Sequence, residues 1–346
     1  MGRKKIIDGG TAGPEDETFN FTLRPRTLDE CIGAPELMEK IRISVAAARE
    51  RGEPMEHVLL HGPPGLGKTT LAYVIAHEMA STIKVTSGPG LTRPSDLIGI
   101  LTNLEERDVL FIDEIHRLSP AVEEYIYPAM EEYKVDFVVD SGMHSRTINL
   151  PLKPFTLIGA TTRAGLLTPP LRTRFGITHH LDFWSEEDLL KRLTMSAAML
   201  RIASDDGALA MMAGRARGTP RIANRLLRRC RDYAQIKADG RLTPKTVDAA
   251  LRLEGIDELG LDELDRNFLR VILDTYRGGP VGIEAVAATL GEETDTLVDV
   301  VEPFLLQIGF LARTRRGRQV TVKACRHLGV DFTPPPGEAG LFDGQE

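Results

Sequence analysis

Hydrophobic positions in the first half of the chain gather in short runs that alternate with helical patterns. The runs HVLLHG, IKVTSG, DVLFIDEI and FTLIGATT each end in or near Gly, Thr or Asp, and a helical pattern begins at Lys68. Short apolar runs that are followed by helices are typical of a parallel sheet covered by helices. We therefore expect the α/β fold class for this part of the chain.

The pattern changes after Trp184, where the strand-like runs stop. The segment SEEDLLKRLTMSAAML opens with a capping-box pattern, Ser185 with Asp188, and predicts an all-helical domain. From about Asp257 the chain reads LDELDRNFLRVILDTY, VGIEAVAATL and TDTLVDVVEPFLLQ, followed by a candidate hairpin made of FLART, RRGR and QVTV. Three helices and a basic hairpin predict a winged helix-turn-helix.

Polar, glycine-rich segments without periodicity occupy both ends, which predicts flexibility there. The expected organisation is a flexible N-terminus at residues 1–20, a large α/β domain at 21–184, a small helical domain at 185–256, a winged helix at 257–332 and a flexible tail at 333–346.

Composition narrows the class of protein. Hydrophobic residues make up 42% and charged residues 27% of the 346 residues, as in ordinary globular proteins. No run of about 18 apolar residues could span a bilayer, and MGRKKIIDGG lacks the apolar part of a secretory signal. We expect a cytoplasmic protein without membrane contacts. Cys31, Cys230 and Cys325 form no CxxC pair, which fits neither a disulfide framework nor a zinc site.

A phosphate-binding motif follows the first apolar run. The segment GPPGLGKTT at 62–70 fits GxxxxGK followed by Ser or Thr, between a strand and a helix. Gly62, Gly65 and Gly67 would let backbone N–H groups surround phosphate oxygens, while Lys68 reaches the terminal phosphates. Thr69 would coordinate Mg2+, and the motif brings Leu66 and Thr70 into the same site. A chance glycine-rich turn would rarely have both the strand and the helix.

Two acidic residues end the third run, VLFIDEIHRL. Adjacent carboxylates at the end of an apolar strand need a cation or water as partner. Strand alternation would separate their roles, so that Asp113 holds the Mg2+ shell and Glu114 activates the attacking water. A simple strand-to-helix cap would explain only one acidic residue. The pair therefore indicates a nucleotide hydrolase.

Further candidates follow the last run and open a later helix. FTLIGATT ends in Thr161 and Thr162, small hydroxyls expected at the same sheet edge. LLTPPLRTRFG carries Arg172 and Arg174, either of which could enter a neighbouring site as an arginine finger, although a solvated loop arginine is the plainer reading. In RGTPRIANRLLRR, a helix capped by Thr219 would place Arg221 at its positive end, an unfavourable position that suggests a nucleotide contact.

These motifs together resemble the RuvB family over nearly the whole chain. The resemblance is carried by GPPGLGKTT, FIDEIHRL, GATTRAG, LRTRFG, GTPRIANRLLRR and GFLARTRRGR. Single motifs are shared by all AAA+ proteins, but the combination of all six motifs is not. The resemblance implies an AAA+ P-loop ATPase domain, a helical lid and a C-terminal winged helix. It also implies an ATPase with DNA translocase and helicase activity that uses ATP and Mg2+ to migrate Holliday junctions during recombination and DNA repair.

The resemblance also implies residue roles. Thr161 or Thr162 would be sensor 1, Arg174 (or Arg172) the arginine finger and Arg221 sensor 2. Further nucleotide contacts implied in this way are Leu23, Arg24, Glu131, Glu132, Tyr133 and Trp184.

The implied partners are duplex DNA, RuvA, RuvC and further copies of the chain in a hexameric ring. RuvA would dock on a hairpin near 133–150, YKVDFVVDSGMHSRTINL, whose DSG turn lies between alternating apolar residues. An ordinary hairpin is an equally good interpretation of that segment.

The net charge of -7, from 43 basic and 50 acidic residues, argues against DNA binding through overall charge. Any contact with DNA must therefore be made by a local group of basic residues. The predicted recognition helix carries Asp295, Asp299 and Glu302, which would repel phosphates. The expected DNA contact is therefore the wing, with little sequence preference because it lacks base-reading side chains. Its arginines are Arg313, Arg315, Arg316 and Arg318.

Four other functions compete with this interpretation. An ATP-gated DNA-binding regulator would need a recognition helix, and the acidic helix counts against it. A non-catalytic AAA+ scaffold would tend to lose Lys68 or Glu114. A clamp-loader subunit is the nearest enzyme, but the winged helix and the missing zinc ligands disfavour it. A metalloprotease is excluded because HEMAS at His77 lacks the second histidine of HExxH.

Overall fold

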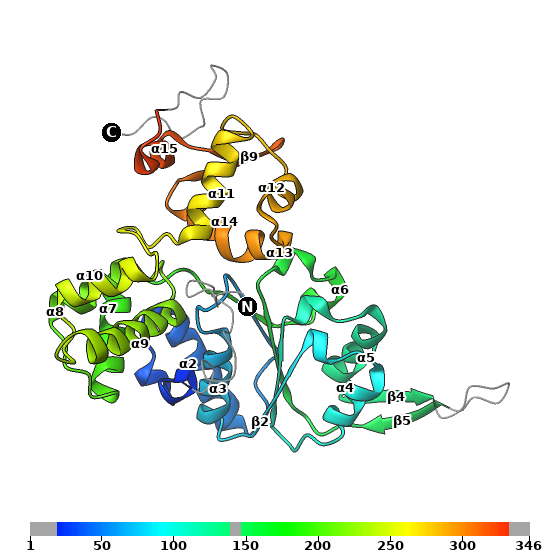
Figure 1. Cartoon of the computed structure of the whole chain (residues 1–346). Helices are drawn as coiled ribbons and strands as arrows, with labels where there is room; N and C mark the ends of the chain where they lie inside the picture. Colours follow the sequence, from blue (N-terminus) through cyan, green and yellow to red (C-terminus); the bar gives the residue numbers. More distant parts are fainter. Residues whose placement is uncertain (1–18, 139–146, 332–346) are drawn as a thin grey trace. The chain divides into compact units, whose positions relative to one another are not determined.

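The computed structural model describes residues 19–138 and 147–331 of the chain. These residues form two compact units, which are described separately (Figure 1). The first unit comprises 19–201 together with Gly218–Asn224, and the second comprises Ile202–Arg217 together with 225–331.

The first unit is built on a five-stranded sheet in the order β2-β3-β6-β1-β7. Its strands are β1 (Val58–His61), β2 (Ile83–Ser87), β3 (Val109–Asp113), β6 (Thr156–Thr161) and β7 (Ile177–His180). All neighbouring pairs are parallel. The predicted parallel sheet is confirmed. The fifth strand, β7, was not expected, because its four residues ITHH form no apolar run.

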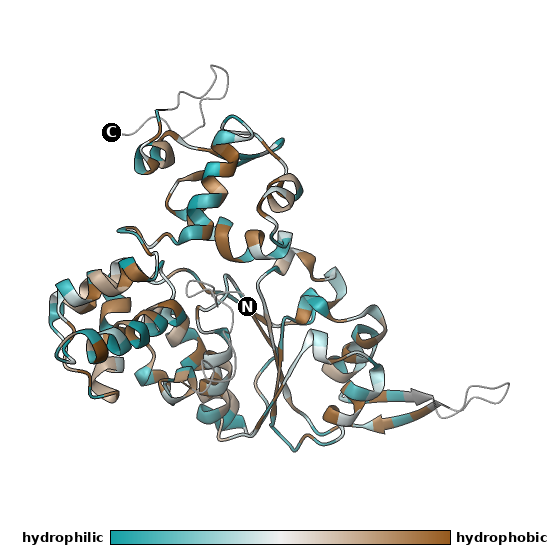
Figure 2. Ribbon diagram, in the orientation of Figure 1, coloured by the Kyte–Doolittle hydropathy of each residue, from teal (hydrophilic) through white to brown (hydrophobic). Residues whose placement is uncertain are grey.

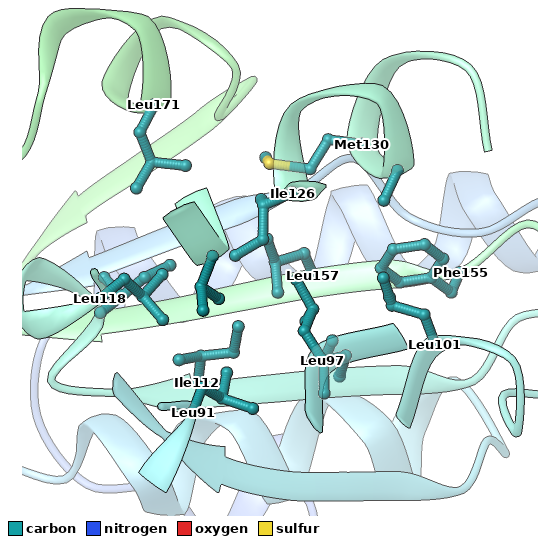
Figure 3. Close-up of a cluster of buried hydrophobic side chains, with 14 of the residues drawn as sticks. Leu91, Leu97, Leu101, Ile112, Leu118, Ile126, Met130, Phe155, Leu157 and Leu171 are labelled. Atoms are coloured by element: carbon teal, nitrogen blue, oxygen red, sulfur yellow. The ribbon is translucent and has the colours of Figure 1, made fainter. Parts of the chain in front are cut away.

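Alternate residues of the central strands pack into two cores on opposite faces of the sheet. Ile112 and Leu157 lie in the core shown in Figure 3, whereas their neighbours Phe111 and Ile158 belong to the other core. The first core is completed by α4 (Pro94–Leu101) and α5 (Pro120–Glu131), the second by α2 (Pro35–Arg51) and α3 (Lys68–Glu78). A strand buried on both faces is a near-continuous apolar run, which explains why the sequence signal was strong for β1, β3 and β6.

Short elements complete the first unit and shape the edge of the sheet. They are η1 (Leu28–Glu30), η2 (Gly88–Gly90), η3 (Ile115–Arg117), η4 (Ala164–Leu166) and α6 (Pro169–Thr173). α6 begins after Thr168, whose hydroxyl accepts a hydrogen bond from the Leu171 N–H at 3.4 Å. This cap fixes the start of the segment that carries the two candidate finger arginines.

A hairpin interrupts the alternation of strands and helices, as predicted. β4 (Lys134–Val138) pairs antiparallel with β5 (Thr147–Pro151) and places Val135 opposite Leu150. Figure 1 shows these strands extending away from α4 and α5. The predicted DSG turn lies outside the described residues.

Four longer helices follow β7, which confirms that this part of the chain is helical. They are α7 (Glu186–Met199), α8 (Asp206–Gly214), α9 (Pro220–Lys237) and α10 (Pro244–Leu253). The Ser185 hydroxyl accepts from the Asp188 N–H at 3.1 Å, as expected of the capping residue of α7. The compact units divide this segment, since α7 and the first turn of α9 belong to the first unit. Figure 2 shows hydrophilic and hydrophobic residues alternating along these helices.

The C-terminal part of the second unit is a winged helix. Its elements are α11 (Glu263–Asp274), α12 (Ile283–Leu290), α13 (Thr294–Thr296), η5 (Leu297–Val301), α14 (Glu302–Gln307), β8 (Leu311–Thr314), β9 (Gly317–Val320) and α15 (Val322–Leu328). The predicted third helix contains a π-helical stretch at η5, next to Pro303, which lacks an N–H for α-helical bonding. The hairpin turn consists of Arg315 and Arg316 alone, shorter than the expected RRGR.

No helix in the described ranges combines the length and the hydropathy needed to cross a bilayer. Cys31, Cys230 and Cys325 are free thiols, and the last two are buried. Within the same ranges, His, Cys, Asp and Glu side chains form no cluster of three that could hold a metal ion.

Candidate active site

A cavity of about 1150 Å³ lies in the first unit at the carboxyl ends of β1 and β3. Its walls bring together the phosphate-binding segment, the acidic pair after β3 and the first turn of α9. In an α/β sheet this edge is where ligands bind. The predicted site residues among its lining are Arg24, Gly65, Leu66, Gly67, Lys68, Thr69, Thr70, Asp113, Glu114, Thr162, Trp184 and Arg221.

The phosphate-binding segment depends on left-handed glycines. Gly62, Gly65 and Gly67 have φ angles of 141°, 80° and 104°, which side chains with a Cβ rarely adopt. A Cβ on Gly62 would also lie 2.3 Å from the Leu181 carbonyl oxygen. Gly67 caps α3, so the N-terminus of that helix opens into the cavity and favours anions there. The segment is a preformed anion cradle.

Lys68 occupies the first turn of α3 and is buried. Its ammonium group donates to the carbonyl oxygens of Gly62 at 2.7 Å and Pro63 at 2.9 Å. These bonds hold the cation inside the loop that would surround a phosphate chain. Thr69 and Thr70 follow on the same turn and line the cavity.

The acidic pair is separated by a turn of the backbone. β3 ends at Asp113, and Glu114 has a left-handed conformation with φ of 48°. The expectation that strand alternation separates the two side chains is wrong, because Glu114 lies beyond the strand. Its N–H donates to the Asp113 carboxylate at 2.9 Å. Both carboxylates nevertheless line the cavity.

The two threonines after β6 differ in surroundings. Thr162 lines the cavity, whereas Thr161 is fully buried. The Thr161 hydroxyl lies 2.8 Å from Nδ1 of His116, and the same nitrogen lies 3.4 Å from the Glu114 carboxylate. Thr162 alone of the two can therefore contact a ligand in this cavity.

The N-terminal segment forms another wall. Arg24 lines the cavity, with its guanidinium carbon 4.9 Å from the centre of the Tyr73 ring. Leu23 is buried and its side chain does not line the cavity, but its carbonyl accepts a hydrogen bond from Arg192. Trp184 lies on the wall beside the start of α7.

Arg221 joins the site from the first turn of α9. It lines the cavity together with Pro220 and Asn224, and its N–H donates to the Gly65 carbonyl at 3.4 Å. α9 begins directly after Thr219, as predicted. The chain thus brings an arginine from far along the sequence onto the phosphate-binding segment.

Other predicted residues lie away from this cavity. Arg172 and Arg174 sit at the end of α6, and Arg174 Nε lies 3.2 Å from the Glu131 carboxylate. Glu132 pairs with Lys134, and the Tyr133 ring packs edge-on against Phe155. These residues would contact a nucleotide only if it were bound outside this cavity.

The wing arginines lie around the tip of the hairpin β8–β9. Arg315 and Arg316 form its exposed turn. Arg313 and Arg318 face each other across the strands, and both pair with Glu302. Glu302 is fully buried, so the expectation that it repels phosphates from a helix surface is wrong. Its charge instead holds the two arginines in place.

The sequence patterns missed several lining residues. Tyr73, four residues after Thr69 on α3, could have been found from helical spacing. His180 and Asp182, whose side chains pair at 2.9 Å, and Arg192 carry no local signal. They reach the cavity only because β7 and α7 pack beside it.

Comparisons with known proteins agree over nearly all of the chain, from residue 23 to residue 329. Family models for the Holliday junction DNA helicase RuvB P-loop domain, the RuvB AAA lid domain and the RuvB C-terminal winged helix domain match residues 23–181, 184–257 and 258–329. The Holliday junction branch migration complex subunit RuvB of Desulfosudis oleivorans is 55% identical over 312 residues, covering 90% of this chain and 91% of that protein.

Solved structures give the same result. The structure of the Thermotoga maritima RuvB Holliday junction branch migration motor matches with a TM-score of 0.82 and 50% identity, covering 90% of this chain and 99% of that chain. A variant of the same protein matches with a TM-score of 0.84 and 49% identity, covering 90% of this chain and 100% of that chain. The chain therefore belongs to the RuvB family, the P-loop ATPases that act as Holliday junction branch migration motors.

Proposed function

We propose that this chain uses ATP hydrolysis to pump duplex DNA through a hexameric ring, and so migrates Holliday junctions during recombination and repair together with RuvA and RuvC. One observation carries the proposal. The phosphate-binding segment, the acidic pair and Arg221 line a single cavity, while Arg174 lies outside it on α6. Because Arg174 lies outside the cavity of its own subunit, it would act on hydrolysis in the cavity of a neighbouring subunit, which supports assembly into a ring.

ATP would bind with its phosphates on the glycine segment and the N-terminus of α3. The Lys68 ammonium would move from the Gly62 and Pro63 carbonyls onto the terminal phosphates, gaining charge-assisted hydrogen bonds. Arg24 and Trp184, which also line the cavity, suit the adenine end. Leu23 would contribute through its backbone, since its side chain is buried among other residues.

Mg2+ fits the donors present at the phosphate end. The Thr69 hydroxyl and the Asp113 carboxylate both line the cavity, and Mg2+ prefers a few oxygen ligands supplemented by water. These two residues would hold the ion, which when bound neutralises charge on the phosphates.

Hydrolysis would rely on side chains of two subunits. Glu114 would accept the proton of the attacking water, and Thr162 lines the same cavity. Arg174 of a neighbour, accompanied by that neighbour's residues 131–133, would stabilise charge on the transferring phosphoryl group. Arg221 at the start of α9 would sense whether the terminal phosphate is present, because it lines the same cavity.

The wing would bind the DNA backbone. Arg315 and Arg316 form the exposed turn, while Arg313 and Arg318 are oriented by Glu302. Contacts to phosphates carry no sequence information, which suits a motor that must pass along any sequence. The hairpin β4–β5 would dock on RuvA through apolar residues such as Ile148, which is 46% exposed.

We propose domain boundaries at 21–184, 185–256 and 257–332 for the ATPase, lid and winged-helix domains. The single helix α9 begins in the first unit, where it carries Arg221, and continues into the second unit. This continuity supports treating the lid as one domain.

The decisive experiment measures ATP hydrolysis and dissociation of a synthetic four-way junction, with and without RuvA. Strand separation that requires ATP and both proteins would support the motor. Hydrolysis that ignores junctions but responds to one duplex sequence would instead support a DNA-binding regulator.

A further inference from the structure

His116 is a buried histidine beside the proposed catalytic carboxylate. It lies on η3, directly after the left-handed turn at Glu114, and its side chain is 6% exposed. The turn folds the chain back, so that the imidazole of residue 116 returns to the carboxylate of residue 114. No motif examined in the sequence gave this histidine a role.

One ring nitrogen of His116 faces two partners. Its Nδ1 lies 2.8 Å from Oγ1 of Thr161 and 3.4 Å from Oε2 of Glu114. Thr161 is fully buried at the end of β6, and its hydroxyl also accepts the Arg163 N–H at 3.0 Å. The imidazole thus connects the ends of β3 and β6 at the cavity edge.

The position of the proton follows from the chemistry of these groups. An ionised carboxylate only accepts hydrogen bonds, so a lone pair on Nδ1 would repel Glu114. A proton on Nδ1 instead donates to the Thr161 hydroxyl and attracts the carboxylate. The contacts therefore favour the tautomer that carries its hydrogen on Nδ1.

Glu114 needs such a partner because its side chain is only partly enclosed. Its backbone is fixed by close packing, since a Cβ on Gly88 would lie 2.4 Å from the Glu114 carbonyl oxygen. The carboxylate, by contrast, is 34% exposed. A buried donor beside it favours one position of the carboxylate, and a misplaced general base loses much of its effect.

We propose that His116 is a positioning residue that orients Glu114 toward the attacking water, and that Thr161 in turn orients His116. The proposal rests on the role of Glu114 proposed above. It also divides the work of the two threonines: Thr162 contacts the nucleotide, whereas Thr161 acts on the general base through His116. Neighbouring residues at the end of β6 would thereby act on the nucleotide and on Glu114.

Two replacements separate hydrogen bonding from space filling. Asn places its amide nitrogen where Nδ1 lies, so His116→Asn keeps a donor toward both partners. Leu has a similar bulk but no donor, so His116→Leu removes the contact. Thr161→Val, which is isosteric, and Thr161→Ser, which keeps the hydroxyl, form the matched pair on β6.

The experiment measures kcat and KM for ATP hydrolysis by the full chain with junction DNA, together with binding of a fluorescent ATP analogue. We expect His116→Leu and Thr161→Val to lower kcat by about tenfold or more, with analogue affinity changed by less than about twofold. His116→Asn and Thr161→Ser should recover most of the lost rate. Glu114→Gln is measured in parallel as the reference.

Two outcomes would overturn the proposal. One is a kcat for His116→Leu within about twofold of the unmodified chain while Glu114→Gln is inactive. The other is loss of analogue binding in His116→Leu and His116→Asn alike, which would make His116 a merely structural residue. Full activity of Glu114→Gln would instead show that the proposed role of Glu114 itself has failed.

Discussion

Arg174 Nε lies 3.2 Å from the carboxylate of Glu131, at the end of α5. The guanidinium carbon also lies 4.4 Å from the centre of the Tyr127 ring. A carboxylate and an aromatic face hold a planar cation in one orientation. The candidate finger is thus held by its own subunit, away from the cavity that the same subunit forms.

We therefore expect Arg174→Ala to lower ATP turnover by about 1,000-fold or more without abolishing ATP binding, because the arginine acts only on the transition state. Steady-state hydrolysis and binding of a fluorescent ATP analogue check this. Arg172→Ala is the matched control and should retain most activity. Mixing Arg174→Ala with Glu114→Gln subunits should restore some turnover, and equal inactivity of the mixture would remove the main support for action between subunits.

Lys68→Ala and Glu114→Gln should fail at different steps. Lys68→Ala removes the buried ammonium group and should abolish nucleotide binding. Glu114→Gln keeps the shape of the side chain but cannot accept a proton, so ATP should remain bound and intact. Analysis of the nucleotide that co-elutes with each variant distinguishes the two. Hydrolysis by Glu114→Gln at the unmodified rate would show that another group is the base.

The wing gives a prediction about salt dependence. Replacing Arg315 and Arg316 by Ala should weaken binding to all duplexes alike and lower the slope of log affinity against log salt by about 2. Fluorescence anisotropy with duplexes of several sequences measures this. Arg326→Ala, an exposed arginine on α15, is the control. An effect on one sequence only would indicate base recognition and favour the regulator.

The buried pair Arg217 and Asp265 predicts a pH-dependent stability of the second unit. Burial raises the pKa of Asp265 from 3.8 to about 7, although the neighbouring Arg217 lowers it. Because the folded state holds the proton more tightly than the unfolded state, this carboxyl stabilises the fold below pH 3.8, and the contribution is lost as the pH rises to about 7.

Asp265→Asn should remove this pH dependence. At pH 8 the substitution leaves the Arg217 charge buried without its carboxylate, which lowers the free energy of unfolding. Near pH 5 the loss should be larger by roughly 2 to 3 kcal/mol, because the unmodified chain gains stability there by protonating Asp265 and the Asn variant does not. Urea unfolding followed by circular dichroism at both pH values measures the difference. An equal loss at both pH values would mean that Asp265 is ionised throughout.

Fold and site were predictable wherever a signal is local. The runs that became β1, β3 and β6 are buried on both faces, so their apolar character is continuous. β7 was not predicted because it is a short edge strand with one apolar residue in four, and its pairing with β1 is decided by distant residues. The hairpin β8–β9 was located correctly, but the predicted turn was two residues longer than the turn in the structure.

The chemistry of the phosphate site was determined by the sequence itself. A glycine segment between a strand and a helix, with Lys68 and Thr69 in the first turn, needs only neighbouring residues to form its cradle. Tertiary structure decided the remaining relationships. Because of the tertiary structure, Thr162 lines the cavity whereas Thr161 contacts His116. Glu302 is buried beneath the wing arginines, and Arg174 pairs with Glu131. These contacts join different elements of the fold, whose approach depends on the packing of whole cores and not on any local pattern.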